Sequence, residues 1–353
     1  MKTFSSILIA LVMGVSLVSC ETDGSSTDST KPKARGSIGE IILVIDSVKW
    51  AGPVGEQLKE IFESDIPGMF RPEARFKVNT VDPRAMTRIL KMSTNLVYVT
   101  TFDDKGSASQ VINAQFSKES KEKAMNDPSI YSLRMEDEYA IGQEVLYLFG
   151  NTEDQLIQNL KKNSGRLQNL FVARKNSAAD FEAKKNLGIE INVPASYQVA
   201  KSEDDFLWVR QITPTANRAD ISLFFYETDY TSEEQTFPAN ILTLRDSITK
   251  QYIFGDPEDP TSYVVSEKQV PPAFRNMVIN DNFTTEIRGA WKTNNTSMGG
   301  SFLGYIMVDQ KKGKLYYIEG FVFYPNEIHR DALREIETIL LNTNVSWKED
   351  QGA

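Results

Sequence analysis

Residues 40–46 read Glu-Ile-Ile-Leu-Val-Ile-Asp, and this stretch decides the fold of the first half of the chain. Five consecutive apolar residues, most of them β-branched, predict a strand buried on both faces, as in a parallel sheet covered by helices. Pro53 follows, where it suits the first turn of a helix, and apolar residues after it recur at helical spacing. The stretch therefore predicts a strand-helix-strand arrangement.

Further predicted elements extend this arrangement to Leu187. They are strands at 75–80, 96–101 and 145–149, a long helical region that starts at a capping box of Thr152 and Gln155, and a surface helix or mobile insertion at 107–125. We assign residues 37–187 to an N-terminal α/β domain.

A β-rich half begins near residue 188. Its predicted strands are 206–212, 221–227, 284–291, 304–309 and 315–323, and its predicted helices are 239–252 and 326–341. The polar stretch Lys311–Lys314 contains a glycine between two apolar runs, which indicates a hairpin. We assign residues 188–348 to a C-terminal α+β domain. The predicted fold class is therefore α+β, with two sheet-plus-helix subdomains.

The composition excludes several kinds of chemistry. The 353 residues include 39 Lys and Arg against 48 Asp and Glu, a formal charge of −9, so we expect no nucleic-acid partner. Cys20 is the single cysteine and His329 the single histidine. These counts therefore exclude disulfides within the chain, thiolate metal sites, metal sites built from several histidines and most Ser-His-Asp catalysis. We expect no metal and no cofactor, and no catalytic residue is assigned.

The N-terminus is predicted to be a signal peptide spanning residues 1–19. A positive start is followed by an apolar stretch at 7–18, which is shorter than the ~20 residues that span a bilayer. Leu17-Val18-Ser19-Cys20 resembles the lipobox of bacterial lipoproteins. The resemblance implies cleavage before Cys20 and attachment of lipid, including palmitate, to this residue. Several acyl chains, at ~0.8 kcal/mol per buried CH₂, would anchor the protein stably. The alternative is an ordinary secretory signal with a chance cysteine.

Residues 20–36 are predicted to form the lipidated cysteine and a disordered tether. This segment is rich in Ser, Thr, Asp, Gly and Pro and lacks apolar periodicity. About 15 flexible residues would give a reach of roughly 20 Å. Glu21 follows the cysteine, which by resemblance to enterobacterial sorting favours the outer membrane over the inner. The protein is thus expected in the cell envelope, facing either the periplasm or the cell surface.

Two further resemblances concern the folded part. The run Gly39–Asp46 followed by Trp50 and Gly55, with Gly320–Pro325, resembles a family of uncharacterised Gram-negative, bacteroidete-type lipoproteins with a domain of unknown function. That resemblance implies no activity. The second half resembles the fold shared by the PsbP and Mog1 families, through an opening strand that ends at Pro194, a long strand pair and a terminal helix.

Asp46, Trp50, Gly52 and Gly55 form the candidate ligand cleft of the first half. Ligands of open α/β sheets bind at the carboxyl ends of strands, and a helix N-terminus offers free N–H groups to an anion. The stretch from Gly52 to Gly55 lacks the lysine and the spacing of a phosphate loop. The alternative interpretation is a turn aspartate and a tryptophan at the edge of the core.

For the other candidate site residues, a structural role is the favoured interpretation. Arg245 and Asp246 are adjacent in a helix and diverge around it, which predicts a salt-bridged surface. His329 has no identifiable partner for proton transfer. Trp208, Trp291 and neighbouring strand aromatics could line a platform, although alternation places about half of them in the core. Three acidic clusters are predicted to be solvated turns, at 136–138, 203–205 and 256–259.

These features predict a membrane-anchored envelope lipoprotein whose folded part is a non-enzymatic module for an envelope protein or polymer. A carboxylate-dependent hydrolase using Asp46 is one alternative. A small-molecule carrier with an aromatic pocket is the other.

Overall fold

The computed structural model describes residues 31–169, 181–184, 187, 191–211, 218–256, 258–279 and 282–342. Cys20, the predicted signal peptide and most of the predicted tether lie outside these residues. Within the described residues, helices combine with two main sheets, so the predicted α+β class is confirmed. Ala34 and Arg35, assigned to the tether by sequence, donate backbone hydrogen bonds to Ile141 and Met92.

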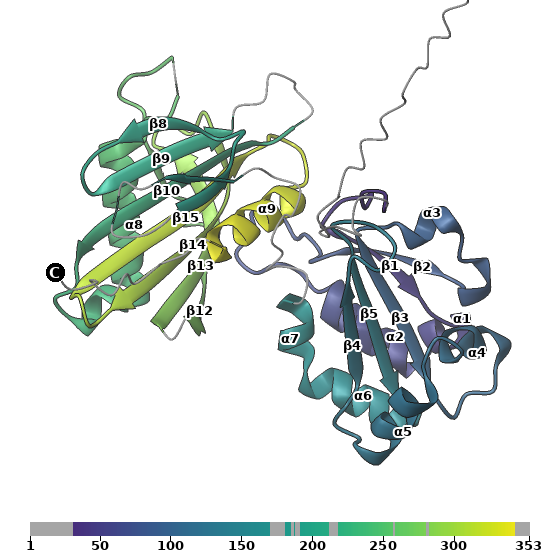
Figure 1. The fold of residues 1–353 in the computed structure, drawn as a ribbon. Coiled ribbons are helices and arrows are strands. Elements are labelled where there is room, and N and C mark those ends of the chain that lie inside the picture. Colours follow the sequence, from purple (N-terminus) through teal and green to yellow (C-terminus); the bar gives the residue numbers. More distant parts are fainter. Residues whose placement is uncertain are drawn as a thin grey trace, which may run out of the picture. The chain divides into compact units, whose positions relative to one another are not determined.

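The first half is built on a five-stranded sheet of order β2-β1-β3-β5-β4 (Figure 1). Its strands are β1 Glu40–Val44, β2 Lys77–Val81, β3 Asn95–Thr101, β4 Ser132–Glu136 and β5 Glu144–Gly150. All pair in parallel except β4, which is an antiparallel edge strand. Because β1 lies between β2 and β3, the predicted buried strand is confirmed.

Helices pack on both faces of this sheet. They are α1 Ser47–Ala51, α2 Pro53–Phe62, the 3₁₀ turn η1 Pro83–Ala85, α3 Arg88–Lys91, α4 Ser107–Asn113, α5 Lys118–Asn126, α6 Glu153–Lys162 and α7 Ser164–Asn169. Side chains alternate along β1, so Ile41 and Leu43 enter the core formed with α2, α6 and α7. Ile42 and Val44 enter the opposite core, formed with α4 and α5.

The second half is built on an antiparallel sheet of order β11-β13-β14-β15-β10-β9-β8, with β12 also paired to β13. Its strands are β8 Gln198–Ser202, β9 Phe206–Gln211, β10 Asp220–Asp229, β11 Val264–Ser266, β12 Ala273–Ile279, β13 Asn282–Thr293, β14 Gly299–Asp309 and β15 Lys314–Phe323. A separate hairpin joins β6 Phe181–Lys184 to β7 Ile191–Pro194. The predicted hairpin is confirmed, with Gly313 at φ 63° in the turn between β14 and β15.

Two helices cover opposite faces of this sheet, α8 Pro238–Tyr252 and α9 Arg330–Leu341 (Figure 1). The 3₁₀ turn η2 Glu233–Thr236 precedes α8. The α9 helix contributes Leu333, Ile336 and Ile339 to one core, while α8 contributes Ile241 and Ile248 to the other. Both predicted helices are confirmed, although the last begins at Arg330, four residues later than the sequence indicated.

A buried ion pair fixes α8 to the sheet, and it corrects the prediction of a salt-bridged surface. Arg245 and Glu319 have fully buried side chains, and two hydrogen bonds of 2.8 and 2.9 Å join them. The Tyr317 hydroxyl donates to Glu319 at 2.6 Å, and the Arg245 guanidinium lies 3.9 Å from the ring centroid of Phe302. The prediction was wrong because Arg245 shares the buried stripe of α8 with Ile241 and Ile248.

Candidate functional site

Asp46 lies at the carboxyl edge of the first sheet, where the sequence placed it. The sheet order reverses between β1 and β3, and ligands of open α/β sheets often bind at such a point. The Asp46 carboxylate accepts a hydrogen bond of 2.8 Å from the N–H of Val48 and so caps α1. This contact is that of a turn aspartate.

Polar side chains near Asp46 are engaged with one another. Lys49 is buried, and its Nζ lies 2.9 Å from Asp104 Oδ2 and 3.7 Å from Glu153 Oε2. Burial raises the pKa of Asp104, but hydrogen bonds from Ser109 and Gly106 and the Lys49 ammonium outweigh it and hold this pKa at about 2. Asp104 is therefore an ionised partner of Lys49.

Trp50, Gly52 and Gly55 make packing contacts. The Lys59 ammonium lies 4.6 Å from the centroid of the Trp50 ring, which packs against the core beneath α2. Gly52 joins α1 to α2, and a Cβ at Gly55 would lie 1.8 Å from the Trp50 carbonyl oxygen. The ligand cleft stays a prediction, and these contacts give its residues a structural role.

Replacing Gly55 with alanine is expected to lower the free energy of unfolding by about 1–3 kcal/mol, because the methyl group would push α2 away from α1. Urea denaturation followed by circular dichroism measures this loss. Gly165→Ala is the matched control, since nothing lies within 4 Å of its added Cβ and alanine favours the helix. Equal stability of the two variants would contradict the packing role.

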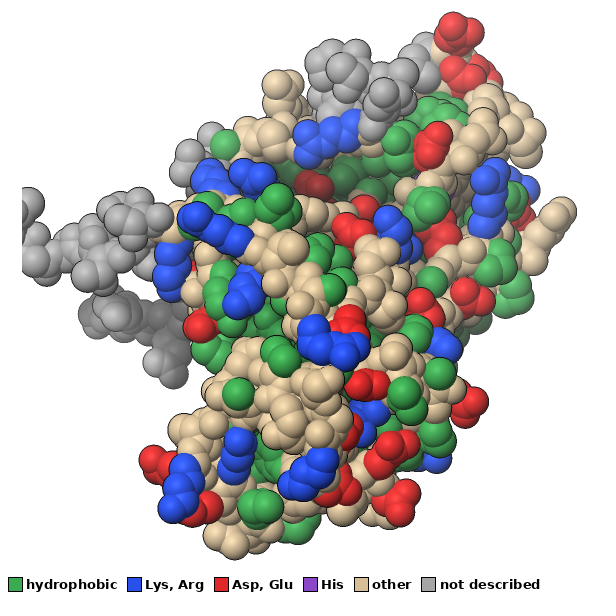
Figure 2. Space-filling view, turned by 90° about the vertical axis from the view of Figure 1, so that its right-hand side faces the viewer, with side chains coloured by type: hydrophobic (Ala, Val, Ile, Leu, Met, Phe, Trp, Pro, Cys, Tyr) green, Lys and Arg blue, Asp and Glu red, His purple; other side chains and the backbone are tan. Residues whose placement is uncertain are grey.

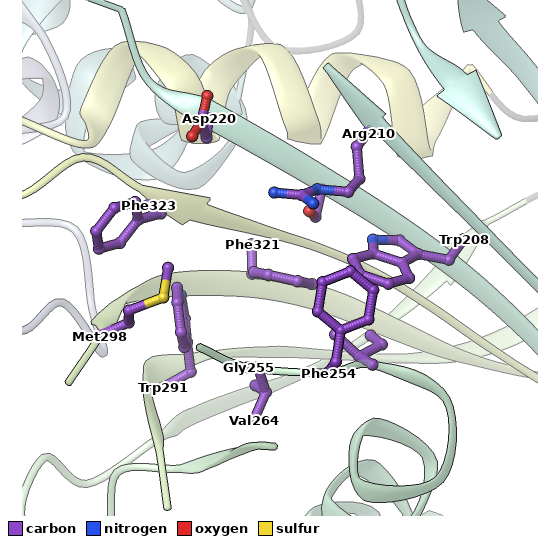
Figure 3. Close-up of a pocket in the computed structure, with 12 residues that line it drawn as sticks. Trp208, Arg210, Asp220, Phe254, Gly255, Val264, Trp291, Met298, Phe321 and Phe323 are labelled. Carbon is purple, nitrogen blue, oxygen red and sulfur yellow. The ribbon is translucent and has the colours of Figure 1, made fainter. Parts of the chain in front are cut away.

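An aromatic pocket opens on the α8 face of the large sheet, beside the residues that follow α8 (Figure 3). Its enclosed space is small, about 60 Å³, and the wider hollow of about 500 Å³ around it includes open solvent. Its apolar lining includes Trp208, Phe254, Trp291, Met298, Phe321 and Phe323. Arg210, Asp220 and Ser222 are its polar lining. Such a mainly apolar wall with a few polar groups is typical of small-molecule sites.

Strand alternation places these side chains on one face. Trp208 and Arg210 are two residues apart on β9, and they pair across the sheet with Phe224 and Ser222 of β10. Phe224 lies in the core beneath α8, whereas Ser222 lines the pocket. The pocket is therefore the continuation of the α8 core beyond the end of the helix.

The two pocket tryptophans differ in their hydrogen bonding. Trp291 donates its indole N–H to the Val322 carbonyl at 3.1 Å and packs edge-on against Phe321 at 5.3 Å. Trp208 is 2% exposed, and its Nε1 meets no hydrogen-bond acceptor within the described residues. An unpartnered buried donor is costly, so a bound acceptor would stabilise this side chain.

Arg210 and Asp220 form the polar end of the pocket. Figure 3 shows the two side chains at one end, with Trp291, Gly255 and Val264 at the opposite end. The Arg210 guanidinium lies 5.3 Å from the centroid of the Trp208 ring. Burial lowers the pKa of Arg210, and the charge of Asp220 opposes this shift. The guanidinium remains charged at neutral pH.

The remaining candidate side chains have structural partners. His329 Nε2 lies 3.0 Å from the Tyr324 carbonyl oxygen and Nδ1 lies 3.0 Å from Ser301 Oγ, so both ring nitrogens are engaged. In the acidic cluster at 256–259, Asp256 and Asp259 accept hydrogen bonds from the N–H groups two residues ahead, as in turns. Across the described ranges, no group of three or more His, Cys, Asp or Glu is placed to hold a metal ion.

Figure 2 shows Lys and Arg side chains intermixed with Asp and Glu over the face it draws, with hydrophobic side chains scattered among them. Among the helices that the structure describes, none has the length and apolar character to cross a membrane.

Two family models match the chain, and both are domains of unknown function. The model of DUF8532 matches residues 34–182, and the model of DUF4837 matches residues 175–342. The predicted resemblance to uncharacterised domains is therefore confirmed, whereas the lipoprotein and bacteroidete assignments stay predictions. The predicted domain boundary at 187 also stays a prediction. No curated protein matches the sequence.

Solved structures with a similar arrangement show very low sequence identity. The Ran-binding protein Mog1p of Saccharomyces cerevisiae is 6% identical, with a TM-score of 0.29 over 46% of this chain and 89% of its own. PA94, a Pseudomonas aeruginosa protein of unknown function, is 10% identical, with a TM-score of 0.23 over 44% and 92%. A protein from Bacteroides thetaiotaomicron is 6% identical, with a TM-score of 0.26 over 45% and 47%. Structural similarities with TM-scores this low do not support any statement about function.

Proposed function

We propose that this protein is a lipid-anchored component of the bacterial cell envelope that binds a small, ring-bearing ligand in the aromatic pocket of its second half. The lipobox resemblance at Cys20 supports the anchor, and the pocket supports the binding role. Binding of a small molecule is non-enzymatic and corresponds to the carrier alternative drawn from the sequence.

One observation carries the binding role. The pocket combines aromatic walls with a buried indole donor that has no acceptor within the described residues. A pocket that served only as core packing would leave this donor unpaired at a cost of about 1–3 kcal/mol. A ligand that carries an acceptor would both fill the space and pair the donor.

Filling the pocket is expected to weaken binding. The test uses the full-length protein in detergent and ligand-observed NMR with four small probes: benzoate, benzamide, benzylamine and acetate. Met298 lines the pocket, so Met298→Trp is expected to weaken binding of every ring probe at least tenfold, because the larger side chain occupies the ligand space. Val278→Trp is the matched control, since Val278 is 69% exposed on β12 and does not line the pocket.

The two variants should keep their circular dichroism spectra. Binding of a ring probe that Met298→Trp weakens and Val278→Trp leaves unchanged supports the pocket as the site. Failure of every ring probe to bind, or binding that Met298→Trp leaves intact, would contradict the proposed function.

A further inference from the structure

The pocket offers two hydrogen-bond donors that the described residues do not use. Trp208 presents its buried Nε1–H. Arg210 presents a guanidinium that donates no hydrogen bond and forms no ion pair within the part of the chain that the structure describes. Both side chains come from the same face of β9, two residues apart. Neither group can accept a hydrogen bond, so they select a ligand that accepts.

The guanidinium adds a geometric preference. Its N–H groups lie in a plane and match the two oxygens of a carboxylate in a bidentate arrangement. It lies over the Trp208 ring, which restricts its position at one end of the pocket. A flat carboxylate is therefore the group that this end recognises best.

Asp220 limits the charge that this end tolerates. Its carboxylate lines the same end of the pocket as Arg210 and offsets part of the positive charge. A phosphate, with more negative charge and a tetrahedral shape, would meet stronger repulsion from Asp220 than a singly charged group would. The polar end is suited to a single negative charge.

The aromatic walls of the pocket are suited to one ring. Trp291 and Phe321 pack edge to face, and Phe254 packs edge-on against Trp208 at 5.0 Å. These rings and Met298 present aromatic faces and a thioether to the space between them. Planar apolar groups gain most from such walls.

We infer that the ligand is a small monocarboxylate with a planar ring, whose carboxylate takes the donors of Arg210 and Trp208 that the described residues leave unused, while its ring lies between the aromatic walls. This inference rests on the proposed function, since it assigns the ligand class of the same pocket. It makes Arg210 and Trp208 the specificity-determining residues.

The four probes separate the contributions of ring and charge. Benzoate is expected to bind at least tenfold more tightly than benzamide, its neutral analogue, and more tightly still than the cation benzylamine. Acetate, which has the carboxylate without the ring, is expected to show no measurable binding. Ligand-observed NMR and calorimetry at constant ionic strength give the dissociation constants.

Two substitutions test the residues. Arg210→Gln is expected to weaken benzoate about tenfold or more and to leave benzamide nearly unchanged. Trp208→Phe keeps a ring but removes the N–H donor, and it is expected to weaken both probes. Arg88→Gln is the matched control, since Arg88 is exposed and does not line the pocket.

The outcomes distinguish the ligand class from the pocket itself. If benzamide or benzylamine binds as tightly as benzoate, or if Arg210→Gln leaves benzoate binding unchanged, the carboxylate assignment is overturned while the pocket stands as a binding site. If no ring probe binds, the proposed function and the ligand class are overturned together.

Discussion

Replacing Arg245 with methionine is expected to lower the free energy of unfolding by about 3–5 kcal/mol at pH 7, the usual loss when one partner of a buried ion pair is removed. Both side chains of the Arg245–Glu319 pair are fully buried, so Glu319 would be left as an uncompensated charge inside the core. Urea denaturation of the full-length protein in detergent, followed by circular dichroism, measures the change.

The loss should depend on pH. Burial raises the pKa of Glu319 above its ordinary value of 4.5 even with Arg245 present, and removing the arginine removes the main opposing attraction. A carboxyl whose pKa is higher in the folded state than in the unfolded state favours folding at low pH and loses that contribution as pH rises. The deficit of Arg245→Met is therefore expected to be smaller at pH 5 than at pH 8.

Removing both charges is the matched control. The double variant Arg245→Met with Glu319→Leu is expected to recover most of the lost stability, because apolar residues of similar volume often replace buried ion pairs without cost. Lys77→Met, which removes one partner of the exposed pair with Glu40, is expected to change stability little. A double variant as unstable as the single one, or a deficit independent of pH, would contradict this account of the pair.

Replacing Cys20 with serine is expected to release the protein almost completely from the membrane fraction and to abolish its labelling with palmitate. The reason is that the acyl chains proposed at this residue supply the membrane affinity. Fractionation of cells that express the full-length chain, with radiolabelled palmitate, measures both effects.

Ser29→Ala serves as the control, because it changes the predicted tether and leaves the lipobox intact. It is expected to fractionate with membranes and to take up label as the unmodified chain does. A Cys20→Ser protein that stays in membranes and still carries palmitate would overturn the anchor.

The buried strands of both sheets could be predicted from sequence, and so could the edge strand β2, whereas the edge strands β4 and β12 could not. Strands such as β1 and β5 are continuous apolar runs, and such a short run directly predicts a buried strand. By contrast, β4 and β12 lie at edges, where several residues face solvent, so they lack an apolar run. Their pairing depends on the neighbouring strand rather than on their own residues.

The candidate pocket could be predicted only in part. The sequence marks Trp208 and Trp291 as aromatic residues on strands, but nothing in the sequence around Arg210 and Asp220 marks these two as neighbours. Their proximity follows from the pairing of β9 with β10, a register that one sequence does not show. Arg245 is different, because its spacing from Ile241 and Ile248 already places it on the buried stripe of its helix.

The strand order of the large sheet has a consequence for when this half of the chain can fold. β10 pairs with β9 and with β15, and Lys314 of β15 contacts Asp229 of β10 across 85 residues of sequence. A two-stranded hairpin of β9 and β10 is marginal alone, so this half stays incomplete until β15 is available. Phe321 and Phe323 of β15 also line the pocket. If the predicted signal peptide directs export of the unfolded chain, the ligand site would thus form only after β15 had crossed the membrane.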